Sequence, residues 1–225
     1  MYINTIEKGC LERASLNELR YVTIDRDKPD ERYNWWSRIY EYSAVMDAIK
    51  NSPTFLRPRC VPFKVHNTGW GWEGDHVIFR NDLDDMFGAD NVVHSDIITD
   101  QFLKTTYHDI TVQDKKYEAR FDIVLCVSIL EHLKEEERTD AINNLYSQLV
   151  PGGTLIISFD VQYYEHWIWL YDIPIVRKHS DDMEANPIGI VGTPLTQYNG
   201  IKNHYKYHNL NVAILSITKD ELYGR

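Results

Sequence analysis

Two apolar runs near the middle of the chain give the clearest pattern of hydrophobic and polar positions. Residues 123–127 and 154–159 are short, rich in β-branched side chains, and separated by an amphipathic segment and a Pro-Gly-Gly turn. Strands that are apolar throughout are typical of a parallel sheet whose two faces are both covered by helices. The pattern predicts an α/β fold in which these two runs are neighbouring parallel strands.

Helical periodicity and short apolar runs assign elements to much of the remaining chain. Apolar positions recur at helical spacing in residues 34–51, 75–87 and 135–149, which we expect to be helices. A short helix is also expected around residues 11–21. The further strands that we expect cover residues 63–67, 91–96, 107–112 and 211–218. The last of them is expected to be antiparallel and to lie at or near an edge of the sheet.

The distribution of polar and aromatic residues suggests how the chain divides. Residues 1–33 are polar and mixed, which indicates an N-terminal extension, and residues 34–225 are expected to form one domain. Within it, residues 161–210 lack clean periodicity and are rich in Tyr and Trp. A segment this long inside a compact domain is typical of a lid or binding loop. The alternative is a peripheral helix and hairpin that only cover the sheet.

Charge and cysteine usage exclude several classes of function. The 225 residues carry a formal net charge of −10, which disfavours a nucleic-acid-binding surface because such surfaces are basic. The three cysteines, Cys10, Cys60 and Cys126, are far apart and show neither zinc-ligand nor disulfide spacing. The N-terminus lacks a signal-peptide pattern, and no apolar stretch is long enough to span a bilayer. We expect a cytoplasmic protein without nucleic-acid or membrane partners and without a metal site.

A glycine-rich segment follows the first expected strand. Gly69, Gly71 and Gly74 form a Gly-x-Gly-x-x-Gly pattern between a predicted strand and a predicted helix, which is the context that a nucleotide-binding turn requires. Glycines there allow a positive φ and let the backbone approach a ligand closely. The alternative is that Gly69 and Gly71 only shape a tight turn.

Residues 121–133 (FDIVLCVSILEHL) and 149–153 (LVPGG) together resemble the second half of the class I S-adenosylmethionine (SAM)-dependent methyltransferase fold. The shared pattern is a strand with an acidic start, a hydrophobic-Glu-His-hydrophobic ending, a helix, and Leu-x-Pro-Gly-Gly before the next strand. The resemblance covers about residues 35–160. It implies a doubly wound, mostly parallel, Rossmann-like sheet of the seven-stranded type with an antiparallel C-terminal strand, and SAM as the cofactor.

The resemblance also implies a set of cofactor contacts. The family has an acidic residue two positions before the first glycine, where this chain has Asn67, which accepts a hydrogen bond but brings no negative charge. Asp96, at the end of the second expected strand, would accept hydrogen bonds from the ribose hydroxyls. The alternative for such an Asp is a helix cap. Asp109 would contact the adenine amino group, while Ile110 packs on the ring.

Residues 37–42 resemble the Arg-x-x-Glu-Tyr segment of a group of small-molecule and sugar methyltransferase-like proteins. This resemblance implies that the helix packs beside the methionine end of the cofactor. Arg38 would then pair with a carboxylate, which a guanidinium can bind through two parallel hydrogen bonds. The alternative is an ordinary surface Arg-Glu pair at helical spacing.

Methyl transfer to a hydroxyl or amine needs alignment of donor and acceptor and removal of a proton. His132, Asp160 and His166 lie at or just beyond strand ends and are the candidates for catalysis, although the family's His at position 132 rarely acts as the base. The acidic charge and the aromatic residues in 163–171 favour a small-molecule or carbohydrate acceptor. The alternative is a degenerate methyltransferase-like binding or scaffold protein without catalysis.

Overall fold

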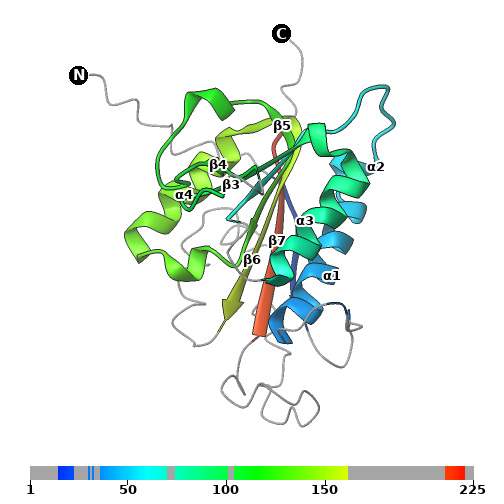
Figure 1. Cartoon of the computed structure of the whole chain (residues 1–225). Coiled ribbons are helices and arrows are strands. Elements are labelled where there is room, and N and C mark those ends of the chain that lie inside the picture. The colour runs from blue at the N-terminus through cyan, green and yellow to red at the C-terminus, as the bar shows by residue number, and fades with distance from the viewer. Residues whose placement is uncertain are drawn as a thin grey trace, which may run out of the picture.

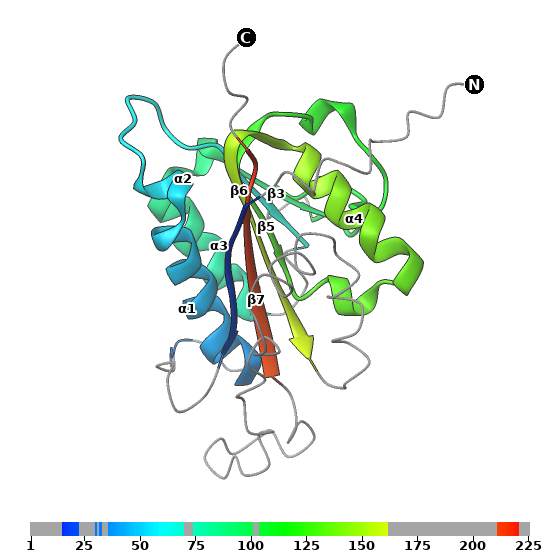
Figure 2. The same ribbon diagram turned by 180° about the vertical axis from the view of Figure 1, so that it is seen from behind.

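The structure, a computed structural model, contains one seven-stranded sheet with helices on both faces (Figure 1; Figure 2). It describes residues 15–22, 30, 32, 36–69, 74–100, 104–161 and 211–220. The strands are β1 (Ser15–Val22), β2 (Val65–Thr68), β3 (Val92–Asp96), β4 (Thr106–Tyr107), β5 (Phe121–Val127), β6 (Leu149–Val161) and β7 (Asn211–Thr218). The helices are α1 (Trp36–Asn51), α2 (Pro53–Leu56), α3 (Gly74–Phe87) and α4 (Glu135–Ser147), with short 3-10 turns η2 (Ala89–Asn91), η3 (Lys115–Tyr117) and η4 (Leu130–His132).

The sheet has the strand order β1-β7-β6-β5-β2-β3-β4. β5 pairs in parallel with β2 on one side and with β6 on the other, in a register that sets Ile123 opposite Thr154. The two apolar runs are therefore neighbouring parallel strands, as their composition predicts. β7 runs antiparallel to β6, which confirms the expected antiparallel C-terminal strand. It lies one strand in from the edge, between β6 and β1.

The helix expected around residues 11–21 is wrong, because β1 is a strand that pairs antiparallel with β7 from Ser15↔Thr218 to Val22↔Val212. The leucines at positions 16 and 19 suggest helical spacing. The unpaired edge of β7 offers a row of backbone donors and acceptors, and pairing with it outweighs the weak local pattern. Part of the expected N-terminal extension thus belongs to the sheet, and β1 runs in the same direction as β6.

The third strand, expected over residues 107–112, is also shorter than the sequence suggests. β4 is limited to Thr106–Tyr107, and the backbone turns directly after it, with the Val112 N–H donating to the Asp109 carbonyl at 3.1 Å. The Asp109 carboxylate accepts from the Thr111 backbone N–H and hydroxyl, at 2.9 and 2.7 Å. This side-chain turn competes with the strand ladder. It places residues 108–111 at the carboxyl edge of the sheet.

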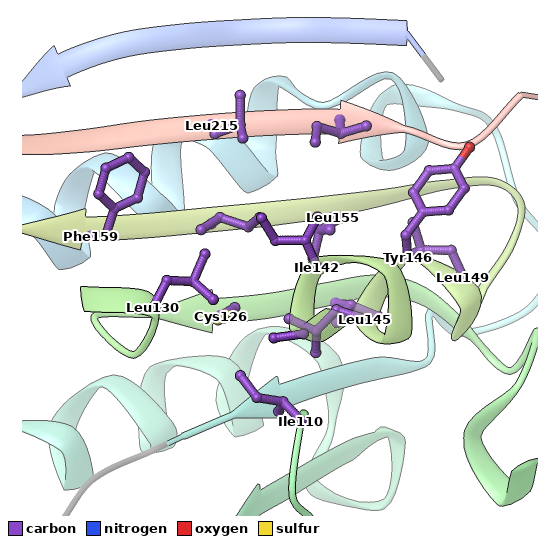
Figure 3. Close-up of a cluster of buried hydrophobic side chains, with 14 of the residues drawn as sticks. Ile110, Cys126, Leu130, Ile142, Leu145, Tyr146, Leu149, Leu155, Phe159 and Leu215 are labelled. Carbon is purple, nitrogen blue, oxygen red and sulfur yellow. The ribbon is translucent and has the colours of Figure 1, made fainter. Parts of the chain in front are cut away.

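Two hydrophobic clusters lie on opposite faces of the sheet. Val124 and Cys126 of β5 face the α4 side, whereas Ile123 and Leu125 face α1 and α3. Figure 3 shows the α4 cluster, in which Leu145 of α4 lies over the strands. Every residue of β5 is buried, which is why its sequence shows no alternation of apolar and polar positions.

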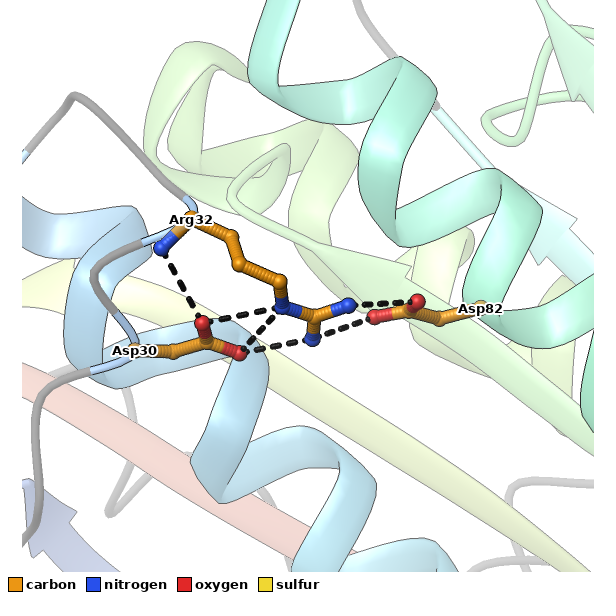
Figure 4. A network of polar contacts seen from close by, with 3 residues as sticks. All are labelled: Asp30, Arg32 and Asp82. Atoms are coloured by element: carbon orange, nitrogen blue, oxygen red, sulfur yellow. Dashed lines mark hydrogen bonds and ion pairs between the residues drawn. The ribbon is translucent and has the colours of Figure 1, made fainter.

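Outside the core, Arg32 joins the segment before α1 to α3 (Figure 4). Its guanidinium pairs with Asp30 and with Asp82 of α3, both at 2.7 Å. The Arg32 side chain is 55% exposed, so solvent screens both pairs and each contributes about 1 kcal/mol or less. The contact fixes the chain that leads into α1 against the neighbouring helix.

The expected division into an extension, a domain and a lid stays a prediction. The lid call over residues 161–210 lies outside the described residues except for Val161, the last residue of β6. Among the helices that the structure describes, none is long and apolar enough to cross a bilayer.

A ring of four buried polar side chains connects β2, β3, the turn after β4 and the end of α4. His66 lies between Gln148 and Ser95, with its Nδ1 2.6 Å from the Gln148 Oε1 and its Nε2 2.8 Å from the Ser95 Oγ. His108 closes the ring through longer contacts, 3.5 Å from the Ser95 Oγ and 3.4 Å from the Gln148 Nε2. Burial lowers the pKa of His66 to about 3 and that of His108 to about 4.

These buried histidines predict a specific pH dependence of stability. In the unfolded chain both histidines take up a proton near pH 6.5, whereas in the folded protein they stay neutral to about pH 4 or lower. The unfolded state therefore binds more protons in this window, and the free energy of unfolding decreases as the pH falls from 6.5 towards 4. Each histidine contributes a slope of about 1.4 kcal/mol per pH unit. Urea unfolding at a series of pH values measures it.

The matched comparison is His66→Gln with the wild type, because this variant removes one buried histidine. Carboxylates that titrate below pH 5 affect both proteins alike. We expect the slope in the variant to be smaller by about 1.4 kcal/mol per pH unit. Equal slopes in the two proteins would contradict the assignment of His66 as neutral.

Candidate functional site

A cavity of about 450 Å³ opens where the parallel strands β2, β3 and β5 end. The carboxyl ends of parallel strands meet at the same edge of a sheet, and open α/β sheets bind their ligands there. Six residues predicted from the sequence line this cavity: Arg38, Gly69, Asp96, Asp109, Ile110 and His132. They come from α1 and from the segments that follow β2, β3, β4 and β5, so distant parts of the chain meet at one site.

The other predicted site residues do not join this lining. Asn67 is buried beneath the cavity and is not part of its wall. Gly71 and His166 lie outside the described residues, as does the side chain of Asp160 at the end of β6. Their assigned roles stay predictions.

Gly69 makes the turn between β2 and the segment that leads to α3. Its φ is +62°, and its N–H donates to the Ser95 carbonyl at 2.8 Å, which ties the turn to β3. A Cβ added at this position would lie 1.9 Å from Cδ1 of Ile129, the residue that covers the turn from the end of β5. Only glycine fits this backbone path without displacing the cavity wall.

Asn67 points away from the cavity, towards α3. Its amide Nδ2 donates to His94 Nδ1 at 3.2 Å, and His94 Nε2 donates in turn to the Asp84 carboxylate at 2.9 Å. Burial lowers the pKa of His94, although the hydrogen bond to Asp84 acts in the opposite direction. Asn67 therefore links β2, β3 and α3 through a chain of hydrogen bonds that ends at the Asp84 carboxylate.

Two aspartates shape the turns on the β3 and β4 side of the cavity. Asp96 accepts a hydrogen bond from the Ile98 N–H at 2.9 Å, so it stabilises a turn and does not cap a helix. Ile97 and Ile98 follow it and are about 60% exposed, which presents an apolar surface at the cavity mouth. Asp109 holds its own turn in the same way.

A buried polar cluster closes the opposite side of the cavity. Arg38 is 8% exposed and Glu41 is fully buried, so the expected alternative of a surface Arg-Glu pair is wrong. The Glu41 carboxylate forms an ion pair with the Arg38 guanidinium and accepts from the hydroxyls of Ser128 and Ser158, at 2.7 and 2.6 Å. The Arg38 Nη1 also donates to the Ser128 hydroxyl at 2.5 Å. Arg38 and Ser128 face the cavity, and Glu41 lies behind them.

Several lining residues were missed by the sequence analysis. Ser128 and Ile129 directly follow β5, and the rule that ligands bind beyond the carboxyl ends of strands could have found them. His108 and Glu137 gave no local signal, because the first lies in an irregular turn and the second in an exposed helical turn. Among the described residues, no three acidic, His or Cys side chains come close enough to hold a metal ion.

The charge on the cavity wall is negative. The lining contains three carboxylates, from Asp96, Asp109 and Glu137. Its positively charged side chain is Arg38, which already forms an ion pair with Glu41. Such a wall favours a cationic ligand over an anionic one. His132 is exposed on the same rim, in the 3-10 turn η4 after β5.

Comparison with known proteins supports the relationship that the sequence suggests. Residues 85–157 match the family described as "Methyltransferase domain". This match spans β3, β4, β5, α4 and most of β6. Comparison with curated protein sequences finds no significant match.

Solved structures with a related fold include the [4+2]-cyclase SpnF, which is 12% identical with a TM-score of 0.48 and 89% coverage of both chains. Another is the 1,6-didemethyltoxoflavin-N1-methyltransferase of Burkholderia thailandensis with S-adenosylhomocysteine bound, at 15% identity, TM-score 0.48 and coverage of 80% of this chain and 77% of that one. A third is the N-methyltransferase NodS of Bradyrhizobium japonicum in complex with S-adenosylhomocysteine, at 11% identity, TM-score 0.43 and coverage of 80% and 98%.

Likenesses at this level of identity and TM-score carry no conclusion about the activity or ligand of this chain. The family match and the strand order do not depend on them. Residues 85–157 are similar to a methyltransferase domain, and the strand order is that of the doubly wound sheet that the sequence resemblance implies.

Proposed function

We propose that the cavity at the carboxyl edge of the sheet binds SAM and that the protein transfers its methyl group to a small-molecule or carbohydrate acceptor. The observation that carries this proposal is the convergence of Arg38, Gly69, Asp96, Asp109 and Ile110 on one cavity. The sequence resemblance assigns these residues to the cofactor from four separate segments of the chain. A chance resemblance would not be expected to bring the four segments together at one cavity.

The residues fit the adenosine part of the cofactor on the β3 and β4 side. Asp96 would accept hydrogen bonds from the two ribose hydroxyls, and Asp109 would accept one from the adenine amino group. The adenine ring would pack on Ile110, and the exposed faces of Ile97 and Ile98 would be covered. Both aspartates are already held by backbone hydrogen bonds, so little side-chain entropy is lost on binding.

The methionine part fits the Gly69, Arg38 and Ser128 side. The absence of a Cβ at Gly69 lets the Ile129 side chain pack directly against the turn and complete the wall on this side. Arg38 would receive the carboxylate of the ligand, with its guanidinium fixed from behind by Glu41. Asn67 supplies no charge, but the carboxylates of Asp96, Asp109 and the rim give the negative wall that a sulfonium requires.

The bound cofactor supplies a methyl group on a sulfonium, whose S–CH₃ bond breaks as an acceptor lone pair forms the new bond and sulfur keeps the bonding electrons. The protein has to align the acceptor on the open side of the cavity and remove its proton. His132 on the rim is placed to take part, and Asp160 and His166 remain candidates for the base. The net charge of −10 and the aromatic residues in 163–171 support a neutral or sugar-like acceptor.

The competing proposal is a methyltransferase-like binding or scaffold protein that has lost catalysis. The observation that favours it concerns Asn67, which stands where the family has an acidic residue that contacts the cofactor. In this protein the Asn67 side chain is hydrogen-bonded to His94 instead. The two proposals differ in whether methyl transfer occurs.

The cofactor assignment predicts the effect of replacing Asp96. Asp96→Ala removes the acceptor for two ribose hydroxyls, and we expect the affinity for S-adenosylhomocysteine to fall by about 1–3 kcal/mol, or roughly five- to 150-fold. Calorimetric titration of the purified protein measures the change. The control is Asp90→Ala, an exposed aspartate at the other end of β3, which should bind like the wild type. An unchanged affinity in Asp96→Ala would place the ribose elsewhere.

The acceptor assignment predicts the outcome of a transfer screen. With methyl-labelled SAM, we expect label in one of the nucleotide sugars or small glycans supplied and none in short RNA, because the wall and the whole chain are acidic. Mass spectrometry of the product would identify the modified atom.

Labelling of RNA alone would overturn the choice of acceptor. Cofactor binding without any labelled product across the screen would favour the non-catalytic alternative. A Gly69→Ala variant serves as the negative control, because its Cβ would displace Ile129 in the cavity wall.

A further inference from the structure

His108 is the member of the buried polar ring that also lines the cavity. His66, Ser95 and Gln148, the other three members, are almost completely inaccessible to solvent. His108 stands immediately before Asp109 and Ile110, which we assign to adenine. The ring therefore lies directly behind the adenine side of the proposed cofactor site.

The chemistry of the ring fixes the protonation of both histidines. The Gln148 amide offers one acceptor, Oε1, to His66 and one donor, Nε2, to His108. His66 Nδ1 must then donate, which leaves its Nε2 to accept from the Ser95 hydroxyl. The Ser95 oxygen accepts from His108 Nδ1, and His108 Nε2 accepts from Gln148. Every donor meets an acceptor around the ring.

Rotation of the Gln148 amide by 180° gives the same result with every hydrogen bond reversed. In either direction each histidine donates through one nitrogen and accepts through the other. A second proton on either imidazole would require the Ser95 hydroxyl to accept from both histidines and to turn its own hydrogen out of the ring, and it would bury a charge. Because of these costs, the buried ring holds His66 and His108 in their neutral forms.

The charged groups around His108 do not offset this constraint. Asp109 and Asp114 raise its pKa and Lys116 lowers it, and burial outweighs all three. His66 faces His108, His94 and Lys116, all of which lower its pKa. The Tyr117 ring packs against both imidazoles, with centroids 4.6 Å from His66 and 4.8 Å from His108, and excludes water.

We propose that His66, Ser95 and Gln148 are positioning residues that hold His108 as an uncharged wall of the cofactor cavity. This inference rests on the proposed function. SAM carries one positive charge more than its demethylated product, so a charged His108 would disfavour the substrate relative to the product. With His108 neutral, its side chain adds no pH dependence to the ratio of the two affinities through the neutral and mildly acidic range.

The first test needs no ligand. Long-range proton–nitrogen correlation spectra of the ¹⁵N-histidine-labelled protein report the tautomer and charge of each imidazole. We expect His66 and His108 each to show one protonated and one unprotonated nitrogen from pH 7.5 to 5.5. A His108 that becomes doubly protonated within this range would overturn the proposal.

The second test is calorimetric titration of SAM and of S-adenosylhomocysteine at pH 7.0 and 5.5. All titrations use a His132→Gln background, because His132 also lines the cavity but does not belong to the ring. With the ring intact in this background, we expect the ratio of their dissociation constants to change by less than about twofold. Gln148→Glu places a carboxylate against both histidines and makes the ring take up a proton between these pH values. Its preference for SAM over the product should then fall by about fivefold at pH 5.5 relative to pH 7.0.

The matched control is Gln148→Met, which removes the amide without adding a charge. Its affinities should fall for both ligands alike, because the segment that carries Asp109 is less well held, and the ratio should stay independent of pH. A pH-dependent ratio in the His132→Gln background with the ring intact would overturn the proposal. A wild type that binds neither ligand would instead refute the proposed function, while the spectra would still decide whether the ring is neutral.

Discussion

The parallel pairing of β5 with β2 and β6 is the constraint on which the rest of the structure depends. Because β5 is buried on both faces, α1 and α3 must cover one side and α4 the other. Because the three strands run in one direction, the segments that follow β2 and β5 reach the same edge, where Gly69 and Ser128 line the cavity. The site is a consequence of strand direction, and the side chains at that edge only determine what it binds.

The buried polar groups around this edge are paired with one another, so that the uncompensated charge lies at the rim of the cavity. Glu41 is fully buried, and its carboxylate is matched by Arg38 and two serine hydroxyls, so the α1 side adds no net charge. Asn67 is uncharged and donates a hydrogen bond to His94, which in turn donates to Asp84. The negative charge of the wall is left to carboxylates at its rim, where water and a ligand can reach them.

The parts of the fold that could be predicted are those with strong, continuous patterns. The apolar runs of β5 and β6 defined the core. The Pro-Gly-Gly sequence near the start of β6 reflects a close approach of backbones, since a Cβ at Gly153 would lie 3.0 Å from two backbone carbonyl oxygens. β1 was mistaken for a helix because its pairing with β7, almost two hundred residues away, leaves little trace in local sequence. Glycines and aspartates at strand ends indicated the cavity wall. Helical spacing identifies the pair of Arg38 with Glu41, but Ser128 and the partners of His108 come from distant segments that sequence spacing could not identify.

Arg38 and His108 lie on different sides of the cavity and differ in charge. This difference affects how each side can act on a ligand. Arg38 and Glu41 form a charged pair, so the guanidinium keeps its full positive charge close to the ligand and can recognise a carboxylate. His108 is neutral because burial lowers its pKa to about 4, and its two nitrogens face Ser95 and Gln148 in the ring. One side can therefore orient a ligand by charge, while the other contributes shape and hydrogen-bonded rigidity without responding to pH. A cofactor that is cationic before reaction and neutral afterwards is suited to a site in which only the fixed charges act on it.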